Sequence, residues 1–239
     1  MGNKPLLEVF CVTWNEEKIL PDFIKWYRSR VPNCLITVID NQSTDLTTKI
    51  AIENECKVIS FTSNDEMDEK TLMDIRNSYW KESEAQWCLV VDADEWVGIT
   101  EDALRKMSKL SANIYKCVGY EMFGTEEDTI DTLVYGCPSA GYCKPVLFKP
   151  PHFNEINLHP GSHDAERIPK IETIWGEPII AMYHTIWRSW SNGIERAHLL
   201  AKRRSEHSRL QGWNIHYEFD DSVHLDYYSR GMELRTKVR

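Results

Sequence analysis

Positive charge, long apolar runs and paired cysteines are all scarce in this 239-residue sequence. It holds 28 Lys and Arg against 37 Asp and Glu, which gives a formal net charge of −9. Nucleic-acid binding needs a surplus of positive charge to meet the phosphates, so we expect no nucleic-acid partner. No apolar run approaches the roughly 20 residues that cross a bilayer, so we expect neither a transmembrane helix nor a signal peptide.

The seven cysteines are odd in number and far apart, without the closely spaced pairs of a metal site. Several stand inside apolar runs, where cysteine behaves as a small hydrophobic side chain. This usage is typical of a reducing compartment, and we expect a cytoplasmic protein. Apolar residues make up 42 % of the sequence, which is enough for a packed core and argues against disorder.

The first hundred residues or so alternate between strand and helix signals. Short apolar runs rich in β-branched or aromatic residues predict strands over residues 7–14, 35–40, 57–61 and 87–92. Amphipathic patterns predict helices over residues 19–30, 44–55 and 71–85. Successive strands start roughly 20 to 30 residues apart, as in β-α-β crossovers. We therefore expect an α/β fold with an open, mostly parallel sheet and helices on both faces.

The rest of the chain has less regular signals. A helix is predicted over residues 100–110, and residues 115–183 carry short strand signals broken by glycine and proline. One of these strands is expected over residues 178–183. A long polar helix is predicted over residues 191–210, and it begins near Ser191 or Asn192 as its cap. We find no internal repeat and no linker.

The last of these helices carries the basic run Lys202, Arg203 and Arg204. A run of charge on a helix is usually a solvated face, and this is what we expect here. The alternative is a surface that docks to an anionic partner or a membrane.

Three predicted strands are followed by polar segments that carry acids. They are Thr13-Trp14-Asn15-Glu16, Asp40-Asn41-Gln42-Ser43-Thr44-Asp45 and Asp92-Ala93-Asp94-Glu95-Trp96. Ligands of open α/β sheets bind beyond the carboxyl ends of the strands. We therefore expect these three segments to converge on one site.

Asp92 and Asp94 are the clearest candidates for a metal site. Alternation along a strand places both carboxylates on the same side. Carboxylate oxygens suit Mg²⁺ or Mn²⁺, whose coordination is commonly completed by substrate phosphates. Such an ion would allow an acidic protein to hold a diphosphate. The alternative is a helix N-terminus, where acids are favoured by the helix dipole.

Taken in order, these motifs resemble those of family 2 glycosyltransferases, which have the GT-A fold. The matching segments are Thr-Trp-Asn-Glu (13–16), Ile-Asp-Asn-Gln-Ser-Thr-Asp-Leu-Thr (39–47), Ile-Arg-Asn (75–77) and Val-Val-Asp-Ala-Asp-Glu-Trp (90–96). The resemblance implies transfer of a sugar, with inversion, from a nucleotide diphosphate sugar (a UDP-sugar favoured) to a carbohydrate or other hydroxyl acceptor. It also implies Mn²⁺ or Mg²⁺ at the Asp-x-Asp motif.

The same resemblance implies one GT-A domain over residues 1–239. Its parts would be a Rossmann-like nucleotide-sugar-binding half (1–97), an irregular acceptor and catalytic half (98–190) and a C-terminal helical segment (191–239).

The resemblance also assigns donor-binding roles. Thr13, Trp14, Asn15 and Glu16 would line the nucleoside pocket, and Asp92 would meet the donor from the fourth strand. Residues 13–16 contain neither glycine nor a cation. This absence counts against the main enzymatic alternative, a sugar-nucleotide nucleotidyltransferase, which carries a glycine-rich basic loop at this place.

Further donor contacts are implied for Asp40, which would bind the base or the ribose, and for Asn41 in the same turn. The alternative for this turn is a cap on the next helix, in which Thr44 or Asp45 takes part. Arg76 matches an arginine beside the donor, where a guanidinium would bind the diphosphate. The alternative for Arg76 is a surface cation paired with Asp74 or Glu82.

The catalytic base is expected in the loop around residues 153–164. Family members often supply an acid from such a loop, which makes Asp164 the first candidate and Glu155 the second. His163 is the third, because the ordinary pKa of histidine lies near neutrality. The alternative for Asp164 is an exposed turn. Loss of the base would leave a non-catalytic carbohydrate-binding protein, the remaining functional alternative.

His184 stands at the end of an apolar segment and resembles the late histidine that completes the metal shell of many GT-A enzymes. Arg188, four residues further on, would meet the same diphosphate. The alternative for His184 is a structural role. Trp175, Trp187 and Trp190 offer flat faces for a sugar ring, although core packing is the usual role of a tryptophan.

Overall fold

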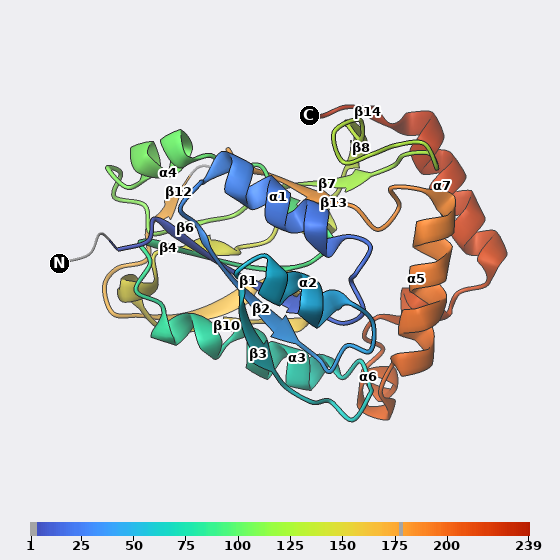
Figure 1. Ribbon diagram of the computed structural model, residues 1–239, viewed down its shortest axis with the longest axis horizontal. Helices are drawn as coiled ribbons and strands as arrows, with labels where there is room; N and C mark the ends of the chain where they lie inside the picture. Colours follow the sequence, from blue (N-terminus) through green and yellow to red (C-terminus); the bar gives the residue numbers. More distant parts are fainter. Residues whose placement is uncertain (1–3, 177–178) are drawn as a thin grey trace.

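The protein is described by a computed structural model that covers residues 4–176 and 179–239. A seven-stranded sheet crosses its middle in the order β12-β6-β9-β4-β1-β2-β3 (Figure 1). The strands are β1 (Leu7–Thr13), β2 (Leu35–Asp40), β3 (Lys57–Ser60), β4 (Trp87–Asp92), β6 (Ile114–Tyr115), β9 (Leu147–Phe148) and β12 (Trp175–Gly176). Strands β3, β2, β1 and β4 are parallel neighbours, and β9 runs antiparallel to β4 and β6. The expected mixed α/β fold with an open, mostly parallel sheet is confirmed.

Both faces of this sheet are buried, as the near-continuous apolar strands require. Along β1, Val9 and Cys11 face one hydrophobic cluster, and Phe10 and Val12 face another. Helices α1 (Leu20–Arg30), α2 (Thr47–Glu53) and α4 (Glu101–Met107) cover the first face. The second face is covered by α3 (Glu69–Arg76), the 3₁₀ turn η1 (Tyr79–Glu82) and β10 (Phe153–Leu158).

A second, five-stranded sheet begins where the central strand of the first one ends. Its order is β14-β8-β7-β13-β5. The strands are β5 (Glu95–Val97), β7 (Val118–Met122), β8 (Tyr135–Pro138), β13 (Ala181–His184) and β14 (Thr236–Lys237). Only two residues separate β4 from β5, so the Asp-x-Asp segment lies at the junction of the two sheets.

The remaining strand β11 (Ala165–Pro169) forms a hairpin with β10. Short 3₁₀ turns occur at η2 (Ala140–Tyr142), η3 (Pro150–His152) and η4 (Pro160–Ser162). The short strand signals expected over residues 115–183 are thus confirmed. The strand expected over residues 178–183 is β13, which ends at His184, and Pro178 lies outside the described residues.

The predicted helix over residues 71–85 is wrong in its bounds. Helix α3 begins earlier, because the Asp68 carboxylate accepts a hydrogen bond from the backbone nitrogen of Thr71 at 2.9 Å. It ends before Asn77, whose side chain binds the backbone of Leu158 in β10 at 2.8 and 3.3 Å. The chain then turns into η1. Local sequence patterns cannot predict the end of α3 at Asn77, because the bond that fixes it is to a residue far away in the sequence.

The single helix predicted over residues 191–210 is two helices, α5 (Trp190–Arg203) and α6 (Glu206–Leu210). The cap of α5 is Ser189, whose hydroxyl accepts from Asn192 at 3.3 Å, and not Ser191 or Asn192. The helix stops because Ser205 caps α6 and also donates a backbone hydrogen bond to Met67, 3.2 Å away. A tertiary contact therefore interrupts a locally helical sequence.

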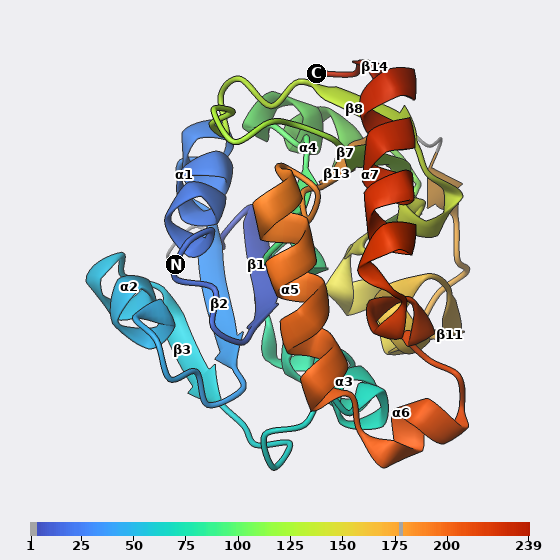
Figure 2. The same ribbon diagram turned by 90° about the vertical axis from the view of Figure 1, so that its right-hand side faces the viewer.

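Two further elements complete the chain, η5 (Ile215–Glu218) and α7 (Asp221–Leu234). Figure 2 shows α5 crossing in front of β1, with α7 alongside it. The C-terminal segment thus returns to the carboxyl ends of the first sheet. Within residues 4–176 and 179–239, no helix is both long and apolar enough to cross a membrane.

Leu89 tests the central packing. It is fully buried in β4, and Leu89→Ala should lower the free energy of unfolding by about 2–5 kcal/mol through lost burial and the cavity left behind. Ile52 on α2 is 62 % exposed, and Ile52→Ala should change it by less than about 0.5 kcal/mol. Urea unfolding of both variants measures the difference, and equal effects would contradict the packing described.

Candidate functional site

A cavity of about 140 Å³ lies at the carboxyl ends of β1, β2 and β4, and we call it the strand-end cavity. Its walls come from all three predicted loops, from α3 and from the C-terminal segment. The ionisable acidic and basic residues that line it are Glu16, Glu69, Arg76, Asp92, Asp94, Glu95, Lys144, His163, His184, Arg196, Arg203 and His216. Its other lining residues are Val12, Thr13, Trp14, Asn41, Met67, Leu72, Tyr142, Gly161, Leu200, Asn214 and Tyr217. The structure therefore brings the loops after β1, β2 and β4 to one site.

The loop after β1 approaches this cavity with Thr13, Trp14 and Glu16. Asn15 lies in the left-handed region at φ 52° and faces a neighbouring hollow. Its side-chain oxygen accepts from the backbone of Thr44 at 2.8 Å. This bond joins the loops after β1 and β2, so Asn15 holds the two loops together.

The loop after β2 forms the turn expected from its sequence. One oxygen of Asp40 accepts from the backbone of Ser43 at 3.1 Å, and the other is buried without a partner among the described residues. Asn41 lines the strand-end cavity and binds Ser63 at 2.8 Å. The cap position of α2 is Leu46 and not Thr44 or Asp45, although Asp45 accepts from the backbone of Thr47 at the start of the helix at 2.9 Å. The helix begins three residues later than the one predicted over 44–55.

Arg76 is buried between two carboxylates. One nitrogen of its guanidinium contacts Glu69 at 2.9 Å, and the other lies 3.0 Å from each oxygen of Asp92. The alternative partners Asp74 and Glu82 are wrong for this arginine, because its side chain turns inward and is only 5 % exposed. Burial opposes the charge, but the two carboxylates outweigh it and raise the pKa of Arg76. A permanent cation therefore stands beside the Asp-x-Asp segment.

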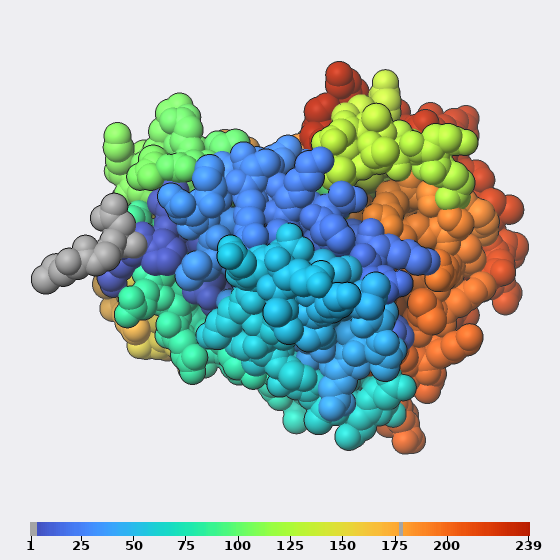
Figure 3. Space-filling view, in the orientation of Figure 1, coloured from blue at the N-terminus to red at the C-terminus, as the bar shows by residue number. Residues whose placement is uncertain are grey.

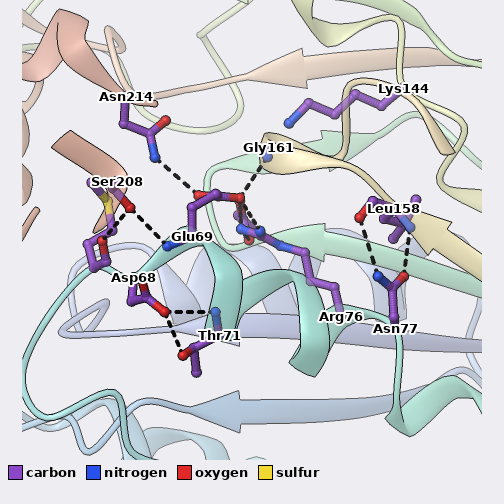
Figure 4. Close-up of polar contacts among 12 residues, drawn as sticks. Asp68, Glu69, Thr71, Arg76, Asn77, Lys144, Leu158, Gly161, Ser208 and Asn214 are labelled. Carbon is purple, nitrogen blue, oxygen red and sulfur yellow. Dashed lines mark hydrogen bonds and ion pairs between the residues drawn. The ribbon is translucent and has the colours of Figure 1, made fainter. Parts of the chain in front are cut away.

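Glu69 is a central residue that the sequence reasoning missed (Figure 4). One carboxylate oxygen accepts from Arg76 and from the backbone nitrogen of Gly161 at 2.7 Å. The other accepts from Asn214 at 3.1 Å. Glu69 thereby joins α3 to the η4 turn and to the C-terminal segment. The signal that was available is Glu69 and Arg76 spaced seven residues apart, two turns of helix on one face.

Asp94 and His184 meet across the junction of the two sheets. The Asp94 carboxylate lies 3.4 Å from Nε2 of His184, and Nδ1 of the same ring lies 2.7 Å from the Glu121 carboxylate on β7. Tyr142 stacks on the imidazole with ring centroids 3.9 Å apart. The ring is thus fixed on three sides, by Asp94, Glu121 and Tyr142.

The charges of this trio are mutually dependent. Burial opposes the ionisation of Asp94, but His184 outweighs burial and lowers the pKa of Asp94 to about 2. Burial likewise opposes the charge of His184, but Glu121 and Asp94 outweigh it and raise the pKa of His184 to about 10. The imidazolium supplies a positive charge between two carboxylates, at the position where a cation would be held.

Asp94 and His184 offer two ligands for a divalent metal ion, which would take the place of the proton on Nε2 of His184. Two ligands at about 2.1 Å from one octahedral ion lie about 3 Å apart, close to the separation of Asp94 and His184. Metal-bound histidine commonly gives its other ring nitrogen to a carboxylate, which is the position of Glu121. Asp92, expected to share the ion, is instead held by Arg76. Among the described residues, no group of three or more His, Cys, Asp or Glu side chains is arranged to hold a metal ion.

Two arginines of α5 close the cavity from the opposite side. Arg196 pairs with Glu16 and binds the backbone oxygen of Trp14 at 3.1 Å. The guanidinium of Arg203 lies 3.6 Å from the centre of the Trp14 ring. Figure 3 shows the atoms of α5 (orange) packed against the segments that follow β1 (blue). The cavity is therefore covered by the chain's own C-terminal segment.

The solvated face expected at Lys202, Arg203 and Arg204 is wrong for two of the three residues. Lys202 is exposed, but Arg203 and Arg204 are only 8 % and 3 % exposed. Arg204 pairs with Glu218 at 2.6 Å, which holds η5 against α5. Their burial follows from the helix break, because the chain folds back over both guanidinium groups.

Arg188 lies in a second hollow of about 220 Å³ that shares Glu16, Asp94 and Arg196 with the strand-end cavity. Burial lowers its pKa. Arg188 therefore shares this hollow with Asp94, but it does not line the strand-end cavity itself, and its contact with a diphosphate stays a prediction.

The structure distinguishes between the three candidates for the base, because only one of them lines the strand-end cavity. Glu155 pairs with Lys81 at 2.6 Å, and neither Glu155 nor the exposed Asp164 lines a cavity described here. His163 does line the strand-end cavity. Its Nδ1 lies 2.6 Å from the backbone oxygen of Gly141. A carbonyl only accepts, so Nδ1 carries the proton and Nε2 is left as an acceptor.

The three tryptophans proposed as sugar platforms also differ. Trp175 is 43 % exposed beneath Arg167, on an edge strand outside the strand-end cavity. Trp187 is buried and stacks on Trp190 with centroids 6.1 Å apart. Only Trp187 lines a cavity, which adjoins the strand-end cavity.

Comparisons with known proteins find neighbours among solved structures only. No family model matches the chain, and no curated protein does. S. aureus TarS in complex with UDP-GlcNAc is 15 % identical with a TM-score of 0.45, over 82 % of this chain and 66 % of that one. A mannosyltransferase from Pyrobaculum calidifontis, in complex with GDP-Man and Mn²⁺, is 12 % identical with a TM-score of 0.45, over 84 % and 63 %.

A third structure is glucosyl-3-phosphoglycerate synthase from Mycobacterium tuberculosis, in complex with Mn²⁺, UDP and glucosyl-3-phosphoglycerate. It is 17 % identical with a TM-score of 0.34, over 48 % of this chain and 44 % of that one. The chain spans less than two thirds of the length of each of these proteins. All three are less than 25 % identical to this chain.

The buried ion pairs of Arg76 are open to a direct test. Arg76→Met leaves Glu69 buried without its cation and should lower the free energy of unfolding by about 3–5 kcal/mol. Arg105 makes the same kind of pair with Glu101 but is 62 % exposed, so Arg105→Met should cost less than about 1 kcal/mol. Chemical denaturation compares the two, and an Arg76→Met variant as stable as Arg105→Met would refute the central role of this pair.

Proposed function

We propose that this protein is a glycosyltransferase that moves a sugar from a nucleotide diphosphate sugar to a hydroxyl group. The observation that carries the proposal is the Asp94–His184–Glu121 arrangement beside Arg76, at the carboxyl ends of three parallel strands. This is the place where open α/β sheets bind nucleotides. The neighbouring structures crystallised with nucleotide sugars agree with the proposed class but do not identify the substrate.

The donor would lie along the loops after β1 and β2. Thr13 and Asn41 line the cavity on that side. Asp40 does not line it, and one of its oxygens is buried without a partner among the described residues, so its proposed contact with the base or ribose requires the loop after β2 to open. The strand-end cavity of about 140 Å³ is below the roughly 300–1,000 Å³ of sites for drug-sized ligands. Donor binding therefore requires α5 and η5 to move away from the strand ends.

The diphosphate would be held by fixed positive charge. Arg76 stands on one side, and Arg196 and Arg188 stand on the other. Asp94 and His184 would hold Mn²⁺ or Mg²⁺, with Asp92 keeping Arg76 in place beside them. When bound, the ion supplies Lewis-acid stabilisation of the negative charge that develops on the departing diphosphate.

The acceptor hydroxyl would be deprotonated by Nε2 of His163. Burial and nearby Lys144 lower the pKa of this histidine, which keeps it neutral and able to accept a proton near pH 7. The acceptor oxygen forms a bond to the anomeric carbon, and the bond from that carbon to the phosphate oxygen breaks. The nucleoside diphosphate leaves with the electron pair, and attack from the opposite face inverts the configuration.

Asp94→Asn tests the metal-holding role. The neutral amide is a poor ligand, so transfer should fall by at least about 100-fold and EDTA should stop the unsubstituted protein. The assay measures nucleotide release from UDP-, GDP-, CDP- and dTDP-sugars with Mn²⁺. Asp102→Asn is the control, because Asp102 is 75 % exposed on α4 and should retain full activity.

Full turnover by Asp94→Asn, or activity that survives EDTA, would refute the metal role. Release of pyrophosphate from nucleoside triphosphate and sugar phosphate would instead identify a nucleotidyltransferase.

His163→Gln tests the proposed base. Loss of a positioned base should lower kcat for transfer by about 10² to 10⁴-fold, with little change in the KM for donor. His159→Gln, in the same loop but outside the cavity, should be close to the unsubstituted protein. The measurement is the initial rate of transfer over pH 5–9. An unchanged kcat in His163→Gln would show that another residue is the base.

A further inference from the structure

An exposed apolar stretch connects the β10–β11 hairpin to strand β12. Its large apolar side chains Ile168, Ile171, Ile174 and Trp175 are each between 37 % and 52 % exposed. Single exposed apolar side chains are ordinary on a protein surface, but a group of them so close together in the chain indicates an interaction surface. The proposed function uses none of these side chains.

The backbone of this stretch is fixed by a buried side chain. Asn113 is fully buried, and its side-chain nitrogen donates to the backbone oxygen of Glu172 at 2.8 Å. Its side-chain oxygen accepts from the backbone nitrogen of Ile174 at 3.0 Å. The backbone nitrogen of Lys170 donates to the backbone oxygen of His152 at 2.8 Å. The exposed side chains therefore stand on a held backbone, so little conformational entropy is lost when a partner covers them.

The stretch lies at one edge of the first sheet and away from the strand-end cavity. Strand β12 is the outermost strand of that sheet, and among the described strands it pairs only with β6. Figure 1 shows β12 at the end of the molecule opposite α5 and α6. In the β10–β11 hairpin, the η4 turn is at one end and Pro169 is at the other. A partner that covers this stretch would therefore leave the strand-end cavity open.

The order of the side chains in this stretch is self-complementary. Ile168 and Ile174 are each three residues from Ile171, and the exposed Lys170 and Glu172 are its immediate neighbours. In an antiparallel contact about a two-fold axis through Ile171, Ile168 would meet Ile174 of a second copy. Lys170 would likewise meet Glu172 of that copy. Apolar side chains would thus face apolar ones, and opposite charges would face each other.

The size and charge of the stretch also suit a second copy. Residues 167–175 expose roughly 600–800 Å², close to the roughly 800 Å² that each partner contributes to a standard interface. Binding to an anionic membrane surface would call for a surplus of Lys and Arg beside the apolar side chains. Residues 166–172 hold two basic and two acidic side chains, so no such surplus is present. A copy of the same chain supplies both the apolar surface and the opposite charges.

We infer that residues 167–175 form the interface of a homodimer, in which two copies of this stretch pack antiparallel about a two-fold axis at Ile171. Ile171 packs against its own copy at the centre. Trp175 lies further out, where the guanidinium of Arg167 is 4.8 Å from the centre of its ring. The inference goes beyond the proposed function and does not rest on it, because no residue of this interface lines the strand-end cavity.

Sedimentation velocity over about 1 to 100 µM protein tests the dimer, and at the upper end we expect twice the mass of one chain. Ile171→Asp brings two like charges together at the axis and should weaken association by at least about 100-fold. Ile52→Asp is the matched control, because Ile52 is 62 % exposed on α2. Helix α2 contacts β3, the strand at the opposite edge of the sheet, so this variant should dimerise as the unsubstituted protein does.

An exchange of charges tests the antiparallel arrangement. Lys170→Glu and Glu172→Lys each place like charges opposite one another, and each alone should weaken the dimer by about tenfold. The double variant restores opposite charges and should dimerise as the unsubstituted protein does. Both side chains are exposed in the single chain, so this recovery reports the contact between copies rather than folding.

A protein that stays monomeric at every concentration would overturn the inference. So would a dimer that Ile171→Asp leaves intact, or a double variant that associates no better than the single ones. Co-sedimentation with vesicles of phosphatidylcholine and phosphatidylglycerol covers the other occupant. Binding of a monomeric chain to these vesicles, lost in Ile171→Asp, would identify a membrane surface and overturn the dimer.

Discussion

A guanidinium enclosed by carboxylates organises the candidate site. Arg76 binds Glu69 and Asp92, and Glu69 in turn holds Gly161 and Asn214. Four segments far apart in the sequence thus meet at a single buried charge, including the central strand and the C-terminal segment. Removal of one member would leave the others buried and uncompensated, which is far more costly than the loss of an exposed ion pair. The geometry around Asp94 depends on this frame, because Asp92 lies two residues away on the same backbone.

The front half of the fold follows from its sequence because its signals are local. Apolar strands and amphipathic helices repeat at β-α-β spacing, and the polar residues at strand ends share one sheet edge as a matter of topology. The convergence of residues 13–16, 40–45 and 92–96 was therefore predictable, and so was the position of His184 near the Asp-x-Asp segment. The five-stranded sheet was not, since its strands pair across long separations and β14 has only two residues.

The errors have one physical source, which is tertiary contact that overrides a local pattern. Asn77 ends α3 by binding a strand 81 residues away, and Ser205 ends α5 by meeting Met67. The sequence predicts a solvated face at Arg203 and Arg204, but both are buried because the chain after the helix break folds over them. Glu69, Glu121 and Arg196 were missed for the same reason. Each of these residues acts through a partner that is distant in the sequence and near only in the folded chain. Glu69 is the exception in one respect, because its spacing from Arg76 indicates a pair on one helix face.

Under the proposed function, helix α5 has a consequence for measurements of affinity. Glu16 and Trp14 already hold Arg196 and Arg203 of α5, so the proposed donor nucleotide would have to exchange these intramolecular contacts for its own. The fraction of molecules in which the helix has swung clear multiplies the intrinsic association constant. A dissociation constant read from a titration would therefore understate the strength of the nucleotide's contacts, and a substitution that loosens α5 while keeping Arg196 would tighten the apparent binding.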